Sequence, residues 1–138
     1  MTTLLVRNAG LLMTMDSRRR EIPGGGIFAR DGLIEQVGPS ADLPPTADQT
    51  LDLSGFFVLP GLVNTHHHFY QTLTRAHPAA INKELFPWLQ ALYPVWARLT
   101  PDALRLATRC ALVELMMSGV TCSSDHQYVF PTGLEDAL

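Results

Sequence analysis

The sequence has 138 residues, 46% of them hydrophobic and 17% charged, a composition that predicts a globular core and excludes a disordered tail. Ten lysines and arginines against thirteen aspartates and glutamates give a formal net charge of -3, which argues against nucleic acid as a partner. Cys110 and Cys122 lie outside any C-x-x-C pair, and neither a signal peptide nor an apolar run of ~20 residues is seen, so we expect a cytoplasmic protein without a disulfide framework or a membrane partner.

The first third of the chain predicts short β-strands. Apolar runs on both sides of Asn8–Gly10 are each long enough for one strand. Residues 26–38 place Asp31-Gly32 between two apolar runs, which is a strong short-range signal for a hairpin. A polar, proline-rich loop follows, and residues 51–59 predict a further strand. Together these patterns predict a small antiparallel sheet.

After Pro60 the pattern changes to strands that alternate with helices. Residues 82–99 have a largely helical pattern, which Pro87 and Pro94 interrupt. Because proline removes a backbone donor and clashes with the preceding turn, we expect bent or broken helical segments in a long loop here.

The clearest helix begins at Thr100–Asp102, where a threonine N-cap precedes a proline at the first helical position and an acid in the first turn. The stripe that follows at helical spacing contains Leu104, Ala107, Ala111, Leu115 and Ser118. Gly119 provides the stop signal, and residues 120–124 predict a strand that leaves the helix.

The last residues predict the start of another helix. Thr132 and Glu135 have the spacing of a capping box, and the sequence ends at Leu138. A helix needs about a dozen residues to contribute to a core, so we expect the chain to be truncated inside an architectural unit.

Three consecutive histidines, His66–His68, follow an apolar run after Pro60-Gly61. They could be a metal site, a pH-sensitive patch or an accident of composition. If the strand continues through them, His66 and His68 share one face and can converge on a metal, whereas His67 takes the other face. For an isolated His-x-His pair, a structural or incidental role is the commoner outcome.

The surrounding residues change that assessment. Pro-Gly-x-x-Asn-x-His-x-His, from Pro60 to His68, resembles the first-strand signature of the amidohydrolase superfamily. Residues 64–76, 84–96 and 123–131 together resemble its aminohydrolase subgroup, which includes deaminases of 8-oxoguanine and hydroxyatrazine ethylaminohydrolase. The chain departs from the subgroup at Gln127, where related members commonly have histidine.

The resemblance implies an α/β fold, namely the start of a (β/α)8 metal-dependent hydrolase barrel preceded by part of a small β-sandwich domain. We expect residues 1–58 to belong to the sandwich and 59–138 to the first strands and helices of an incomplete barrel. It also implies one divalent metal ion, zinc or alternatively iron, with His66 and His68 as two of its ligands. The other ligands and the general acid and base are expected outside these 138 residues, which alone should neither catalyse nor hold a metal tightly.

Three further residues are candidate substrate contacts. Gln71 follows the histidines, and its amide can both donate to and accept from a purine or triazine edge; the alternative is an ordinary loop residue. Trp88 could stack on an aromatic ring or could simply belong to the core of a bent helix. His126 falls at the carboxyl end of the second barrel strand, where active-site groups gather, or is a structural histidine.

The function that the resemblance implies is hydrolytic deamination of a purine-like or other amino-substituted heteroaromatic ring by a homo-oligomeric enzyme. The first candidate substrate is 8-oxoguanine. One alternative is a triazine aminohydrolase or dechlorinase on the same scaffold, because fold does not fix the substrate. Another is a non-catalytic metal-binding or interaction domain that is complete at 138 residues.

Overall fold

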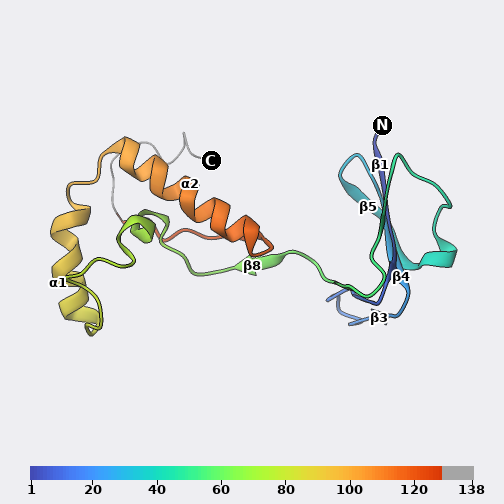
Figure 1. Ribbon diagram of the computed structural model, residues 1–138, viewed down its shortest axis with the longest axis horizontal. Coiled ribbons are helices and arrows are strands. Elements are labelled where there is room, and N and C mark those ends of the chain that lie inside the picture. Colours follow the sequence, from blue (N-terminus) through green and yellow to red (C-terminus); the bar gives the residue numbers. More distant parts are fainter. Residues whose placement is uncertain (129–138) are drawn as a thin grey trace. The chain divides into compact units, whose positions relative to one another are not determined.

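The computed structural model describes residues 1–128, and it divides the chain into two compact units, Met1–Pro60 and a second unit that begins at Gly61 (Figure 1). The predicted capping box at Thr132 lies outside the described residues. No helix within the described part of the chain is long and apolar enough to cross a membrane.

The first unit is built on a four-stranded sheet with the order β5-β4-β1-β6. Its strands are β1 (Thr3–Ala9), β4 (Gly25–Arg30), β5 (Leu33–Pro39) and β6 (Gln49–Asp52). The pairs β1–β4 and β4–β5 are antiparallel, but β1–β6 is parallel. The prediction of an antiparallel sheet was therefore wrong for β6, which reaches β1 through the loop and short 3-10 helix at Ser40–Asp42.

The predicted hairpin at Asp31-Gly32 is confirmed. Arg30 pairs with Leu33, so the loop has two residues, and both adopt positive φ, 48° at Asp31 and 81° at Gly32. Two successive positive φ values match the right-handed twist of the flanking strands. The Asp31 carboxylate also accepts a hydrogen bond from the Thr2 backbone N–H at 2.7 Å, which attaches the start of the chain to this turn.

A second, smaller sheet corrects the prediction of one strand at 51–59. Its order is β3-β2-β7, with β2 (Leu11–Met13), β3 (Glu21–Ile22) and β7 (Phe57–Val58). Residues 51–59 therefore contribute to two sheets, the end of β6 and all of β7. The break is a turn in which the Asp52 carboxylate accepts from the Ser54 hydroxyl at 2.6 Å and from its backbone N–H at 3.0 Å. These bonds lower the pKa of Asp52 to about 2, and the bond from the hydroxyl has the largest effect.

The core of the first unit consists of Leu5, Phe28 and Leu43, and it leaves no room beside Gly26. A Cβ added at Gly26 would meet the Val6 carbonyl oxygen and would lie 2.8 Å from Cδ1 of Leu43. Its cross-strand partner Gly38 has open space at the same position. An added methyl group would therefore clash at Gly26 but not at its neighbour Gly38.

Gly26→Ala is expected to lower the free energy of unfolding of this unit by about 1–3 kcal/mol, because backbone and core must both shift. Gly38→Ala is the matched control and should stay within about 0.5 kcal/mol of the wild type. Hydrogen exchange of the β1 and β4 amides in the whole protein measures both variants. Equal protection in the two would contradict the packing assigned to Gly26.

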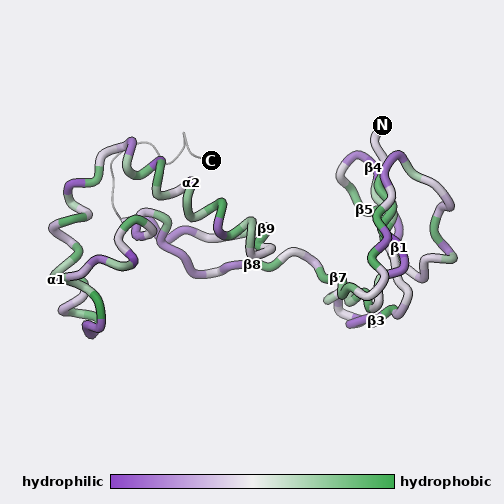
Figure 2. Tube along the Cα trace, viewed as in Figure 1, coloured by the Kyte–Doolittle hydropathy of each residue, from purple (hydrophilic) through white to green (hydrophobic). Residues whose placement is uncertain are grey.

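The second unit has an α/β arrangement in which β8 (Leu62–Asn64) and β9 (Val120–Ser123) form a parallel pair. Between them the chain forms η2 (Phe69–Thr74), α1 (Leu85–Trp96) and α2 (Pro101–Met117). Helix α2 packs against η2 and β9. Hydrophobic and hydrophilic segments alternate along α2 in Figure 2, as expected for a helix with one buried face.

Helix α2 matches its prediction closely. The Thr100 hydroxyl accepts from the Ala103 N–H at 3.2 Å, Pro101 is the first helical residue, and the chain turns at Gly119 with a φ of 82°. The residues of the predicted stripe that are buried are Leu104, Ala107, Ala111 and Leu115. Ser118 is exposed instead and caps the helix end, where its hydroxyl donates to the Glu114 carbonyl at 2.6 Å.

Helix α1 corrects the prediction of broken segments, because Pro87 and Pro94 lie in one helix of 12 residues. Pro87 is in the first turn, where backbone N–H groups have no partner within the helix. Pro94 is in the last turn, so its missing donor removes one bond close to the end. The Ala97 N–H still donates to the Tyr93 carbonyl at 2.9 Å and closes the helix.

Candidate metal and substrate site

The three histidines follow strand β8 and do not continue it, which corrects the register assumed from the sequence. The strand ends at Asn64, whose side-chain oxygen accepts from the His66 N–H at 3.0 Å. An asparagine that bonds the backbone two residues ahead favours a turn over an extended strand. His66 to His68 therefore lie in the loop at the carboxyl end of β8.

His66 and His68 nevertheless lie together. Their ring centroids are 5.1 Å apart with the rings edge-on. His126, from the segment after β9, completes the cluster: its ring stacks on His66 at 5.1 Å and is edge-on to His68 at 5.4 Å. The parallel pairing of β8 with β9 accounts for this, since the carboxyl ends of parallel neighbours lie side by side.

One hydrogen bond fixes the tautomer of His68. Its Nδ1 lies 2.8 Å from the His126 carbonyl oxygen. A carbonyl can only accept, so Nδ1 carries the proton, and in the neutral ring Nε2 keeps its lone pair. A backbone carbonyl behind one ring nitrogen is the usual arrangement for a histidine that binds a metal through the other. The donor set of His66 and His68 thus fits a divalent metal.

His67 has a different environment. Its ring packs on Phe69 with a centroid distance of 5.0 Å, and its Nδ1 is buried without a hydrogen-bond partner among the described residues. Burial lowers the pKa of His67, and the charge of Asp125 opposes that shift. His67 therefore interacts mainly with the interior of this unit.

The pair is not a complete metal site. Among the residues from Met1 to Tyr128, no group of three or more histidine, cysteine, aspartate or glutamate side chains is placed to hold a metal ion. Catalytic zinc usually has three protein ligands. The role of His66 and His68 as ligands stays a prediction, and so does the expectation that the others come from elsewhere.

A hollow of about 220 Å³ adjoins the histidines. It is lined by His66, His67, His68, Gln71, Thr72 and Arg75. The Gln71 amide donates to the buried Tyr70 hydroxyl at 3.1 Å, which holds its plane in place. Burial raises the pKa of Tyr70. Arg75 pairs with Glu114 at 2.6 Å, and both side chains are exposed. Gln71 is thus placed beside the histidines, as a substrate contact requires.

Trp88 packs against the core of the second unit. Trp88 packs on Trp96 with a centroid distance of 5.3 Å, next to the core formed by Tyr70, Ala80, Leu92, Trp96 and Leu104. Trp96 in turn contacts Tyr70, and Tyr70 contacts His68 at 6.3 Å. A role for Trp88 against a substrate stays a prediction, since its observed contacts are those of the core.

Two residues near the site were missed by the sequence analysis. Asp125 accepts from the Phe69 N–H at 2.9 Å, and the Tyr128 hydroxyl lies 3.5 Å from Nε2 of His68. Both flank His126, so their position in the 123–131 segment was the available signal. Spacing alone does not reveal that this segment forms hydrogen bonds with the loop that carries the three histidines.

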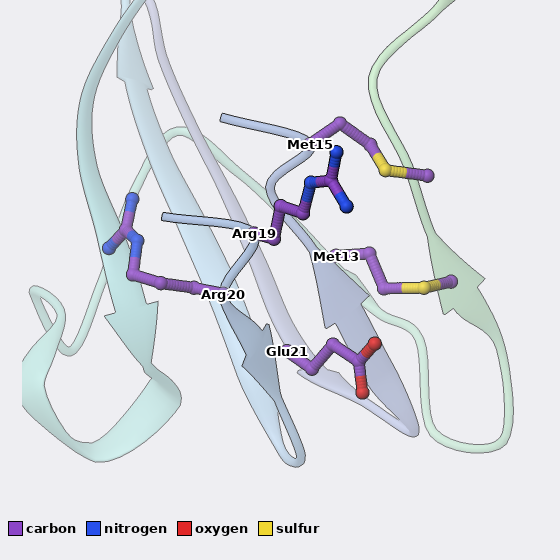
Figure 3. Close-up of a pocket in the computed structure, with 5 residues that line it drawn as sticks. All are labelled: Met13, Met15, Arg19, Arg20 and Glu21. Atoms are coloured by element: carbon purple, nitrogen blue, oxygen red, sulfur yellow. The ribbon is translucent and has the colours of Figure 1, made fainter. Parts of the chain in front are cut away.

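A second hollow, of about 400 Å³, lies in the first unit and is lined by Met13, Met15, Arg19, Arg20 and Glu21 (Figure 3). In Figure 3 Arg19 extends toward Met15, whereas Arg20 extends to the other side of the turn. Arg20 there pairs with Asp16 at 2.9 Å. The hollow therefore presents thioethers and charged side chains but no convergent set of ligating or nucleophilic groups.

Comparisons with known proteins extend these observations. A sequence model described as the amidohydrolase family matches residues 57–138. The chain is similar to 8-oxoguanine deaminase from Pseudomonas aeruginosa, with 57% identity over 116 residues that cover 83% of this chain and 26% of that enzyme. It is also similar to hydroxydechloroatrazine ethylaminohydrolase from Pseudomonas sp. strain ADP, with 34% identity that covers 93% of this chain and 29% of that enzyme.

Among solved structures, the chain resembles atrazine chlorohydrolase from Arthrobacter aurescens TC1 in complex with zinc. The TM-score is 0.81 at 29% sequence identity, and the match covers 88% of this chain and 28% of the other. The chain thus spans a little over a quarter of the length of the proteins it matches.

Proposed function

Because the chain belongs to the amidohydrolase family, we propose that its protein is a metal-dependent enzyme that removes an amino group from a heteroaromatic ring by hydrolysis. The two relatives named above are a deaminase and an aminohydrolase. The observation that carries the proposal is the His66–His68 pair, in which Nε2 of His68 keeps a lone pair beside a hollow of about 220 Å³.

His66 and His68 would hold one divalent metal, for which we propose zinc. The chemistry that a bound metal of this kind supplies is acidification of water, whose pKa falls from its value in bulk water to about 7. The His126 carbonyl keeps His68 in the Nδ1–H tautomer. For the general acid and base we propose residues outside 1–128.

Gln71 would orient the substrate. Its Nε2 is held by the Tyr70 hydroxyl, so the amide plane is fixed before a ligand binds, and its oxygen can accept from a ring N–H. His126, whose ring stacks on that of His66 at 5.1 Å, would be a further substrate contact. Both residues would contribute to orientation more than to the bond-breaking step.

For the substrate we propose 8-oxoguanine first, with guanine, isocytosine and hydroxytriazines as further candidates. The support is the 57% identity with an 8-oxoguanine deaminase, which exceeds the 34% identity with the triazine-derivative aminohydrolase. The structural similarity to atrazine chlorohydrolase keeps a triazine as the alternative.

Ammonia release by the whole protein, measured across these ring compounds, tests the proposal. We expect the highest kcat/KM with 8-oxoguanine, loss of activity after dialysis against a chelator, and recovery when zinc is added. A protein that prefers a hydroxytriazine would favour the alternative substrate. Activity restricted to amide, ester or phosphoester bonds would contradict deamination altogether.

A further inference from the structure

We infer that Asp125 is a positioning residue, whose carboxylate fixes the loop that carries His66 and His68 against the segment after β9. The inference rests on the proposed metal site and adds a residue that acts on that site through the backbone. Asp125 is not among the residues that line the hollow beside the histidines, so we expect its effect on the site to pass through the backbone.

Four hydrogen bonds join the two segments. The Ser124 N–H donates to the Asn64 carbonyl at 2.9 Å, and the His126 N–H donates to the His67 carbonyl at 2.8 Å. His68 Nδ1 donates to the His126 carbonyl at 2.8 Å, and the Phe69 N–H donates to Asp125 Oδ1 at 2.9 Å. The two segments are therefore joined continuously from the end of β8 to the start of η2.

The Asp125 bond is the last of this series and the one with a charged acceptor. A hydrogen bond to a charged group contributes more than a neutral one, and leaving the Phe69 N–H unpaired in the interior would be costly. Phe69 is only 3% exposed and belongs to a core cluster with Ala111 and Leu115. The carboxylate thus connects the segment after β9 to a residue that packs against α2.

The position of Asp125 explains how it can influence the metal ligands without contacting the metal. It lies directly before His126, whose carbonyl selects the tautomer of His68. If the carboxylate is lost, Phe69 and the segment at 125–126 can separate, and the carbonyl no longer holds His68 Nδ1. Outer-shell groups that orient a histidine ligand typically change metal affinity about 10- to 100-fold.

The test compares Asp125→Ala with Asp125→Asn in the whole protein, by competition for zinc with a chromophoric chelator. Asp125→Ala is expected to weaken zinc binding about 10- to 100-fold. Asp125→Asn keeps an oxygen that accepts from Phe69 and should stay within about threefold of the wild type. Leu115→Ala is the control, because it destabilises the same cluster but removes none of the four bonds.

Amide hydrogen exchange in the metal-free protein gives a second readout. Asp125→Ala should accelerate exchange at Phe69, which loses its acceptor, and also at His126, whose N–H donates to the His67 carbonyl and not to the carboxylate. Unchanged exchange at His126, or equal zinc loss in Leu115→Ala, would overturn the positioning role. If the wild type binds no zinc but Asp125→Ala still accelerates exchange at Phe69 and His126, the positioning role would be supported and the proposed function contradicted.

Discussion

His66→Ala and His68→Ala are each expected to abolish zinc retention and turnover in the whole protein, whereas His67→Ala should retain zinc. The rings of His66 and His68 are 5.1 Å apart beside the hollow, so each alanine removes one of two adjacent donors. Loss of an outer-shell partner already changes metal affinity about 10- to 100-fold, and loss of a ligand should exceed that range. Zinc content by mass spectrometry and ammonia release measure the effect.

His67→Ala should act on stability instead. The His67 ring packs on Phe69, so its removal leaves a small gap in the interior of this unit and lowers the melting temperature. His77→Ala is the matched control, because His77 lies outside the cluster and its ring accepts from the Ala79 N–H at 3.3 Å. Equal loss of zinc in all three cluster variants would show that the histidines do not divide into two ligands and one packing residue.

The sequence predicted that His66 and His68 lie together, but for a reason that the structure corrects. Alternation along a strand predicted that His66 and His68 share a face, yet the strand ends at Asn64. The two rings approach each other because the loop turns at Asn64 and because the His126 carbonyl holds His68. A sequence pattern of period two cannot distinguish a continued strand from this loop, because both conformations bring His66 and His68 to the same side.

Local signals predicted the elements whose ends are fixed by nearby residues. Helix α2 has its own N-cap in Thr100 and its own stop in Gly119, and the hairpin at Asp31-Gly32 needs only its two turn residues. The resemblance to the amidohydrolases is likewise confirmed by the match over residues 57–138. Such features depend on residues that are close in sequence.

Elements that depend on distant partners were predicted poorly. β6 pairs in parallel with β1 on the side opposite β4, and nothing within 49–52 specifies this. Pro94 suggested a break, but α1 continues because its buried residues pack in the core around Trp96. His126 joins the histidine cluster from 58 positions away, which spacing alone could not establish.

Trp96→Ala is expected to lower the free energy of unfolding of the second unit by about 3–5 kcal/mol. Trp96 is only 1% exposed and contacts Tyr70, Trp88 and Tyr93 at centroid distances of 5.2, 5.3 and 5.7 Å. Its Nε1–H also donates to the Thr74 hydroxyl at 3.0 Å, which connects α1 to the end of η2. Denaturant unfolding followed by circular dichroism measures the loss.

Two control variants separate packing from hydrogen bonding at Trp96. Trp96→Phe keeps a large ring but removes the donor to Thr74, so a loss of about 1–3 kcal/mol is expected, smaller than that of Trp96→Ala. Tyr93→Ala removes a ring that is half exposed, and its effect should be smaller again. Trp96→Ala should also raise KM, because Tyr70 loses the ring that packs against it and then holds the Gln71 amide less firmly. A Trp96→Ala protein as stable as the Tyr93→Ala variant would show that this cluster does not support the site.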